Sequence, residues 1–334
     1  MKQLRTYWVT TFVSFALSAG VAAVFTPVES IPKFPLPDMR RVFISSYGDR
    51  DAVHRLFYFG LFGFDRRIAN ADMLIMGNSH AELGLSAERI GAAFSTPQKP
   101  YRVMNLGIGW GEGFPFDKEL LKRQHLRNKS ILLELYAMLV DRYSVVGGPI
   151  LAEARFAAWV RVVETWASTF NDWTLDGILP RISYVNQRFV VGRFLAYPVG
   201  LRLLETGDVF DYWIPNWGEV YRVTPQKLIS RPDPPVPVPL TGDYLAQSRY
   251  VLDADMMRAN RLTVLTTLMP SSEIHQPDSR SLADALHVPF LPIAFGDITL
   301  YDGYHANADG RNRATEHLVE ELRTLGIMPK EDSR

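Results

Sequence analysis

The sequence predicts an α/β fold in which a parallel sheet carries helices on both faces. Short apolar runs that suit buried strands alternate with helical patterns along much of the chain. This order is typical of parallel sheets, because the chain must cross back over the sheet between strands. Of the 334 residues, 47% are hydrophobic and 22% are charged, which is ordinary for a globular protein with a sizeable core.

The composition also excludes several function classes. The formal net charge is zero and no long run of lysine and arginine is present, so nucleic acid is not an expected partner. The absence of cysteine excludes disulfides, thiolate metal sites and a cysteine nucleophile. It is also consistent with a protein that is exported without oxidative folding.

The N-terminal segment, residues 1–28, predicts a membrane anchor. Lys2 and Arg5 precede residues 7–25, which contain no charge. At about 1.5 Å per residue, this run nearly crosses a hydrocarbon core of about 30 Å. The flanking charges favour a cytoplasmic N-terminus, so we expect a single-pass protein of the bacterial inner membrane with its remaining residues in the periplasm. The alternative is a cleaved signal peptide with a small-residue site at residues 21–23; the run is long for that class.

The first α/β segment, residues 29–144, begins with an expected linker. Four prolines between positions 27 and 37 argue against regular structure over residues 26–70. The patterns after this linker predict, in order, a strand at 71–76, a helix at 86–93 with Ser86 as N-cap, a strand at 101–106, a helix at 116–127 and a strand at 130–136. The second segment, residues 241–334, predicts a helix at 243–260, strands at 262–268 and 288–293, and a closing helix at 309–325.

Residues 145–240 interrupt this alternation and predict an inserted, mostly helical cap that is rich in tryptophan. Five prolines between positions 232 and 239 close it as an extended segment. An apolar stripe at heptad-like spacing is expected on one helix face and consists of Phe156, Trp159, Val163, Trp166, Phe170 and Trp173. Packing against the core of the cap itself is the favoured interpretation. The alternative is a surface for a membrane, a sugar chain or a partner helix.

Two short motifs carry the chemistry. Gly77-Asn78-Ser79-His80 follows the first strand, and Asp302-Gly303-Tyr304-His305 precedes the last helix. Gly107 follows the second strand. Because ligands bind beyond the carboxyl ends of the strands in an open α/β sheet, we expect all three segments at one edge.

The residue types fit a serine hydrolase. Ser79 would be the nucleophile, His305 the base and Asp302 the carboxylate that orients it. The N–H groups of Ser79 and Gly107 would bind the oxyanion, and Asn78 is assigned to the same oxyanion or substrate-binding region. We expect His80, Glu82 and Glu134 to have only supporting roles, and no metal or other cofactor is expected.

These motifs resemble the SGNH (GDSL-like) hydrolase superfamily. That family carries its serine in a Gly-Asp-Ser-like turn after the first strand and Asp-x-x-His before the last helix. Asn307 and Gly310 are similar to its continuation, and the segment 105–107 is similar to the block that provides an oxyanion glycine. The likeness covers about residues 71–136 and 243–325. It implies a flavodoxin-like three-layer sandwich and a triad of Ser79, Asp302 and His305.

One departure narrows the resemblance. The family usually has an asparagine after the third strand, whereas residues 133–138 contain none. In this respect the chain is similar to membrane-anchored SGNH-like proteins of cell-envelope O-acetylation systems. That likeness implies a glycan substrate such as alginate, peptidoglycan or teichoic acid, and a multispanning O-acyltransferase as partner.

Three functions follow as hypotheses. The leading one is a membrane-anchored serine acyl-transfer enzyme, an O-acetyltransferase or acetylesterase of an envelope glycan. The second is a carboxylesterase or lipase that transfers the acyl group to water. The third is a catalytically silent assembly factor that uses its cap to hold an acyltransferase or polymer.

Overall fold

The computed structural model describes most of the chain between residues 40 and 326. The described residues are 10, 11, 13, 14, 17, 40–47, 50–109, 112–134, 143–178, 199–214, 219–220, 259–265, 283–284, 287–291 and 305–326. The expected helix at 243–260 lies almost entirely outside this set.

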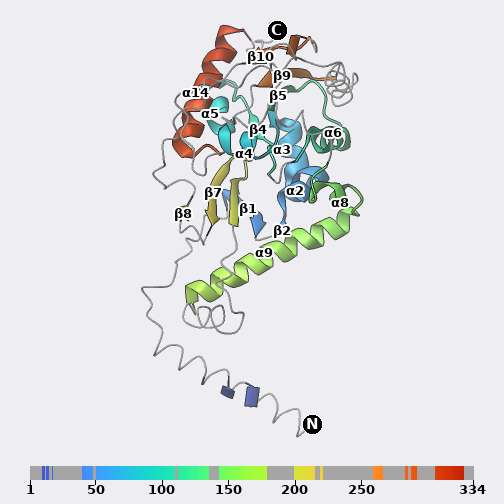
Figure 1. Ribbon diagram of the computed structural model, residues 1–334, viewed down its shortest axis with the longest axis vertical. Coiled ribbons are helices and arrows are strands. Elements are labelled where there is room, and N and C mark those ends of the chain that lie inside the picture. Colours follow the sequence, from blue (N-terminus) through green and yellow to red (C-terminus); the bar gives the residue numbers. More distant parts are fainter. Residues whose placement is uncertain are drawn as a thin grey trace, which may run out of the picture.

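A five-stranded parallel sheet forms the centre of the fold (Figure 1). Its strands are β3 (Met73–Met76), β4 (Val103–Asn105), β5 (Ser130–Glu134), β9 (Arg261–Leu265) and β10 (Phe290–Leu291). They lie in the order β10-β9-β5-β3-β4, and every neighbouring pair is parallel. Numbered along the chain, this is the doubly wound order 2-1-3-4-5. The prediction of a parallel α/β sheet is confirmed.

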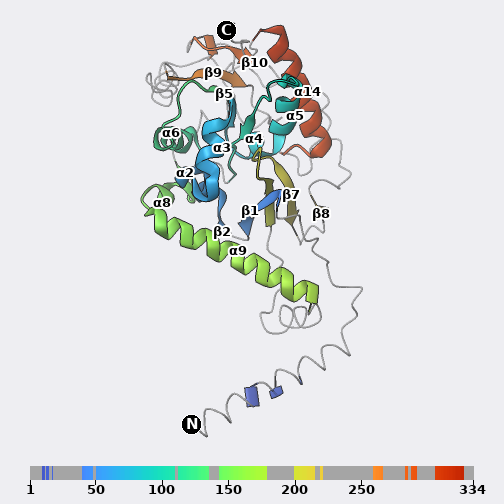
Figure 2. The same ribbon diagram turned by 180° about the vertical axis from the view of Figure 1, so that it is seen from behind.

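Helices cover both faces of this sheet (Figures 1 and 2). Alternate residues of β3 point to opposite faces, so Leu74 and Met76 belong to one buried cluster and Met73 and Ile75 to another. The first cluster includes residues of α2 (Val53–Phe59), α3 (Phe64–Asn70) and α6 (Phe114–Arg123). The second includes residues of α4 (Ser79–Gly84), α5 (Ala87–Phe94) and α14 (Ala308–Thr324).

The expectation that residues 26–70 lack regular structure is wrong for the described part. This region contains β1 (Val42–Tyr47), β2 (Arg50–Asp51), α2, the 3₁₀ helix η2 (Leu61–Gly63) and α3. Within residues 26–70 the last proline is at position 37, and a proline disturbs only its immediate neighbours. Phe57, Phe64 and Ile68 are fully buried beyond that point.

The described part of the insert contains strands as well as helices. It begins with α8 (Gly147–Leu151) and α9 (Arg155–Ile178), but β6 (Val199–Leu203), β7 (Val209–Ile214) and β8 (Glu219–Val220) follow. These strands join β1 and β2 in an antiparallel sheet of order β2-β1-β6-β7-β8. Because β6 pairs directly with β1, the insert shares a sheet with the segment before it.

Up to Phe170, the aromatic stripe of α9 does not pack as one face. The buried side of α9 is formed instead by Ala158, Val162, Thr165 and Thr169. Trp166 donates from Nε1 to the Ile44 carbonyl at 2.9 Å, and its ring centroid lies 4.6 Å from that of Phe62. Both partners lie outside the insert, so the predicted packing against a core of its own is wrong for Trp166. Phe156 and Trp159 stack on each other and are 75% and 42% exposed.

A turn of the insert connects the two sheets. The Thr206 carbonyl accepts a hydrogen bond from the Asn105 N–H at the end of β4, at 2.7 Å. The buried carboxylate of Asp208 accepts from the N–H groups of Ala87 and Glu88, at 2.7 and 2.9 Å, and from the Ser86 hydroxyl at 3.1 Å. Asp208 therefore caps α5 from outside that helix.

The N-terminal prediction falls mainly outside the described residues. Among the part of the chain that the structure describes, no helix is both long and apolar enough to cross a bilayer. The anchor at residues 7–25 stays a prediction.

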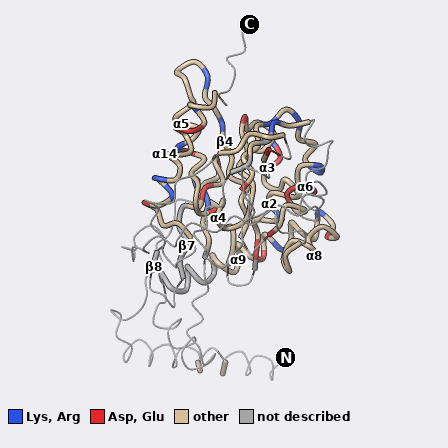
Figure 3. The backbone as a smooth tube through the Cα atoms, turned by 45° about the horizontal axis from the view of Figure 1, so that its top comes forward, with Lys and Arg blue, Asp and Glu red and all other residues tan. Residues whose placement is uncertain are grey.

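Charged residues are interspersed over the described backbone (Figure 3). Arg55 of α2 and Glu153 form a bidentate pair at 2.8 and 2.7 Å, with each side chain 12% exposed. Arg89 and Glu316 make a more exposed pair between α5 and α14. Only the first pair is shielded enough for a substantial energetic effect.

The cap provided by Asp208 gives the first prediction. Asp208→Ala should lower the free energy of unfolding by about 1–3 kcal/mol, because it leaves N–H donors of α5 buried without an acceptor. Urea titration of the full-length protein measures this loss. Glu205→Ala, in the same turn but with an 83% exposed side chain, is the matched control and should cost less than about 0.5 kcal/mol. Equal stability of the two variants would contradict the bridging role of the turn.

Candidate active site

The fold brings Ser79 and His305 together at one edge of the parallel sheet. Ser79 is the first residue of α4, just beyond β3, and His305 lies just before α14. The His305 Nε2 is 2.9 Å from the Ser79 Oγ, although the residues are 226 positions apart in sequence. This distance is within reach for proton transfer between a nucleophile and its base. Asp302, the predicted third member, lies outside the described residues.

The nucleophile turn has no space for a side chain at Gly77. This residue has a φ of +146°, and a Cβ atom there would lie 2.8 Å from the Glu134 Cβ and 2.9 Å from the Ala81 Cβ. Glu134, at the end of the neighbouring strand β5, is fully buried. Glycine is therefore required by both the backbone conformation and the packing.

Asn78 caps the helix that Ser79 begins. Its Oδ1 accepts from the His80 backbone N–H at 2.9 Å and lies 2.8 Å from the His80 Nδ1. The His80 ring stacks on the His305 ring, with centroids 5.3 Å apart and planes 18° apart. The Asn78 oxygen is thus committed to α4 and to His80. That Asn78 contacts the substrate stays a prediction. Such a contact would use the side-chain amide nitrogen, because the oxygen already binds His80.

Gly107 lies beside α4, but its N–H already has an acceptor. A Cβ atom at this position would be 2.5 Å from the Glu82 backbone nitrogen and 2.9 Å from the Ala81 carbonyl carbon. Close packing against the backbone of α4 is therefore sufficient to require glycine here. The Gly107 N–H donates to the Asn105 Oδ1 at 2.9 Å. Its predicted oxyanion role requires this bond to be released. The N–H of Ser79 is better placed, because the first turn of a helix provides no acceptor for it.

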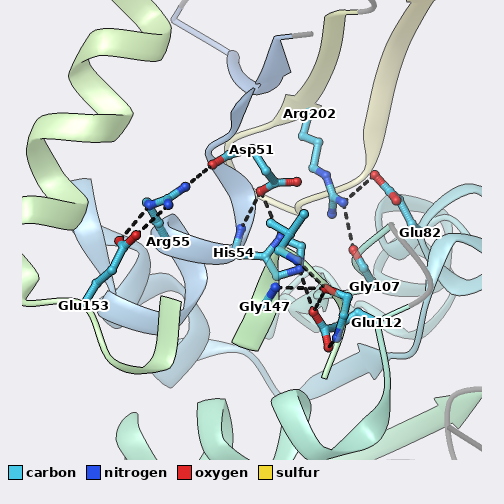
Figure 4. A network of polar contacts seen from close by, with 11 residues as sticks. Asp51, His54, Arg55, Glu82, Gly107, Glu112, Gly147, Glu153 and Arg202 are labelled. Carbon is cyan, nitrogen blue, oxygen red and sulfur yellow. Dashed lines mark hydrogen bonds and ion pairs between the residues drawn. The ribbon is translucent and has the colours of Figure 1, made fainter. Parts of the chain in front are cut away.

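Arg202 is the residue that sequence reasoning missed. It lies on β6 and is fully buried. Its Nη2 donates to the Glu82 Oε1 at 2.6 Å and to the Gly107 carbonyl at 2.8 Å (Figure 4). Burial raises the pKa of the Glu82 carboxyl, whereas Arg202 and the nearby His305 oppose this rise. An arginine in an otherwise apolar strand segment was the available signal, but no motif marks it.

A second buried network lies beside Arg202 (Figure 4). His54 is fully buried between two carboxylates, with its Nδ1 2.9 Å from Asp51 and its Nε2 3.0 Å from Glu112. Burial opposes the charged form of His54, but Asp51 and Glu112 together raise its pKa to about 9. Burial likewise opposes the charged carboxylates, but contacts with His54 hold the pKa of Asp51 and that of Glu112 below their ordinary values. The imidazolium and the two carboxylates are thus paired inside the protein.

This network does not have the form of a metal site. Both nitrogens of His54 are already in direct contact with carboxylate oxygens. Within the described ranges, no group of three or more His, Asp or Glu side chains is arranged to hold a metal ion.

Comparison with known proteins adds no family. No protein-family model, curated protein or solved structure matches this chain. The function must therefore be inferred from the geometry of the site.

The pKa of His54 predicts a dependence of stability on pH. A group whose pKa rises from its ordinary value of 6.5 to about 9 on folding stabilises the protein fully below pH 6.5, and this contribution is lost as pH rises through 9. The rise corresponds to about 3 kcal/mol. Urea unfolding of the full-length protein should therefore give a lower free energy at pH 9.5 than at pH 6.5.

His54→Gln tests the origin of this decline. The variant should be less stable at pH 6.5, because Asp51 and Glu112 lose their cationic partner, and its decline toward pH 9.5 should be smaller. His287→Asn removes an exposed histidine and should keep the parental decline. A decline of the same size in His54→Gln would assign it to other groups.

Proposed function

We propose that this protein is a membrane-anchored, extracytoplasmic serine acyl-transfer enzyme of the SGNH type. The observation that carries the proposal is the 2.9 Å contact between the Ser79 Oγ and the His305 Nε2. Both residues lie at the carboxyl edge of the parallel sheet, where α/β proteins bind their ligands. Fully buried residues on both sides of the turn support a fixed position for the nucleophile.

The chemistry would proceed in two steps. The Ser79 Oγ attacks the carbonyl carbon of an ester, and its proton passes to the His305 Nε2. The bond from the carbonyl carbon to the ester oxygen then breaks, and His305 returns the proton to that oxygen. In the second step an acceptor hydroxyl, of water or of a sugar, loses its proton to His305 and attacks the acyl-serine. The bond between the acyl carbon and the Ser79 Oγ then breaks, and His305 returns the proton to that oxygen, which regenerates Ser79.

Two further groups complete the proposed machinery. Asp302 would hold the His305 tautomer and stabilise the imidazolium that forms during attack. The Ser79 N–H, at the N-terminus of α4, would donate to the oxyanion that develops on the carbonyl oxygen. Gly107 would join it only if its amide leaves Asn105.

The strand order supports the SGNH-type assignment. An order of 2-1-3-4-5 is that of flavodoxin-like sheets, which is the fold implied by the resemblance in the two motifs. The third strand ends in the buried Glu134, whereas the family usually has an asparagine after this strand. This difference favours the divergent, anchored branch of the resemblance.

An envelope glycan is the proposed acceptor or donor of the acyl group. Tethering through residues 7–25 would keep the site near the membrane surface, where a multispanning O-acyltransferase would deliver an exported acetyl group. The exposed, stacked pair of Phe156 and Trp159 on α9 is compatible with contact to a sugar ring or a partner helix. Acyl transfer to water by the same residues is the simpler alternative.

Substitution of the serine and the histidine tests the catalytic proposal. Ser79→Ala and His305→Ala should each reduce hydrolysis of p-nitrophenyl acetate by at least about 10³-fold, because the two groups act as a unit. A fluorophosphonate should label the parent on Ser79 and leave Ser79→Ala unlabelled. Ser95→Ala, which removes a hydroxyl at the far end of α5, is the control and should retain activity. Parental turnover by Ser79→Ala would end the catalytic proposal.

Asp302→Asn is a separate test of the third member. The variant should fold normally and turn over at least about 10²-fold more slowly, because the histidine tautomer is no longer enforced. Parental turnover would mean that another group orients His305.

Whether the protein adds acetyl groups to a glycan or removes them is tested in the organism that carries the gene. Deletion of the gene should lower the O-acetyl content of one envelope glycan, and Ser79→Ala should fail to restore it. Quantification of released acetate measures both outcomes. A higher acetyl content in the deletion strain would make the protein a deacetylase, and full rescue by Ser79→Ala would favour a silent assembly factor.

A further inference from the structure

Arg202, from the insert, places its guanidinium beside Gly107 and Glu82 (Figure 4). Both of these residues border the turn that carries Ser79. The Arg202 Nη2 binds the Gly107 carbonyl at 2.8 Å. The N–H of the same peptide unit, which belongs to Ile108, donates to the Gly77 carbonyl at 2.9 Å. A peptide unit is planar, so a bond that fixes the carbonyl also fixes the direction of the N–H. Arg202 is therefore connected, through one rigid unit, to the residue two positions before Ser79.

The same nitrogen reaches the other side of the turn. Nη2 donates to the Glu82 Oε1 at 2.6 Å, and Glu82 lies three residues after Ser79 in α4. The Glu82 backbone N–H in turn donates to the Asn78 carbonyl at 3.0 Å. The short, charge-assisted bond thus holds the first turn of the helix that begins with Ser79. One guanidinium restrains the chain both before and after the nucleophile.

Stability of the fold alone does not explain an arginine here. Arg202 is fully buried, and its guanidinium lies 5.6 Å from the centroid of the Phe57 ring. Removing such a charge from water is costly, and a buried ion pair is often replaced by neutral groups of similar volume without loss of stability. A function in positioning is consistent with retaining the charge.

We infer that Arg202 is a positioning residue for Ser79, so that the insert supplies a required part of the active site. The inference rests on the proposed serine acyl transfer. Arg202 contacts neither Ser79 nor His305 in this structure; it acts through Gly107 and Glu82. A displacement of about 1 Å at a reacting group is enough to cost about 10²-fold in rate.

The test is the double variant Arg202→Met/Glu82→Gln. It removes the guanidinium and neutralises its carboxylate partner, so no unpaired buried charge is left to unfold the protein. In the full-length protein, kcat for p-nitrophenyl acetate per active site should fall about 10- to 100-fold with KM changed less than about threefold. Active sites are counted by fluorophosphonate titration, and the rate of labelling per site should fall in parallel.

A matched pair of variants distinguishes positioning from stability. Arg55→Met/Glu153→Gln removes another shielded pair that connects α2 to the insert, and it should leave kcat per active site unchanged. Arg202→Lys keeps a charge and one donor toward the site, and it should recover part of the lost kcat. A merely structural role for Arg202 would lower the number of titrated sites and leave the rate per site at the parental value.

The two proposals fail in different ways. Parental turnover by Ser79→Ala would overturn the acyl-transfer proposal itself. An inactive Ser79→Ala together with a parental kcat per site in Arg202→Met/Glu82→Gln would overturn the positioning role alone. A larger fall in Arg55→Met/Glu153→Gln than in the Arg202 pair would also overturn it.

Discussion

The buried guanidinium of Arg202 is the constraint on which the site depends. A charge inside a protein must be met by acceptors in fixed positions, because water cannot make up for a missing partner. Here the acceptors are the Glu82 carboxylate and the carbonyls of Gly107 and Gly207, the last at 3.3 Å. They come from α4, from the chain beyond β4 and from the turn between β6 and β7. The hydrogen bonds of Nη1 and Nη2 therefore bring together three segments that border the nucleophile.

Close backbone contact is the second consequence of this arrangement. The chain around Gly107 approaches α4 so closely that a Cβ atom would meet the backbone of Ala81 and Glu82. On the other side of the turn, a Cβ atom at Gly77 would meet Glu134 and Ala81. A helix packed this tightly has little freedom to move, because protein interiors are as dense as molecular crystals. The same two contacts explain why glycine occupies both positions.

Oppositely charged side chains are paired in the protein interior beside the site. His54, Asp51 and Glu112 form one buried group. The positive charge of Arg202 also helps to lower the pKa of Asp51. Glu112 in turn accepts from the hydroxyl and the N–H of Ser144. Such groups are costly when a single member is lost and nearly neutral when complete. They connect β2, α2 and the segment just before the insert through polar contacts as well as through apolar packing.

The sequence by itself determined the parallel sheet and the location of the chemistry. Four of the five strands of that sheet lie within a predicted range, and β9 begins one residue before its range, because continuous apolar runs are required where both faces are buried. Ser86 and Asn307 cap α5 and α14, since capping depends on residues close in sequence. The sequence likewise predicted that the motifs around Ser79 and His305 lie together, because the carboxyl ends of parallel strands meet at one edge of the sheet.

Only the tertiary structure decided how the insert contacts the rest of the fold and the candidate site. The pairing of β6 with β1, the capping of α5 by Asp208 and the contacts of Arg202 with Glu82 and Gly107 all join residues more than 90 positions apart. No local pattern specifies such partners, because each depends on where the rest of the chain has folded. The surroundings of Asn78 and Gly107 were also decided there. In the folded protein the Asn78 Oδ1 binds the first turn of α4, and Gly107 packs against the backbone of that helix. Their roles toward a substrate stay predictions.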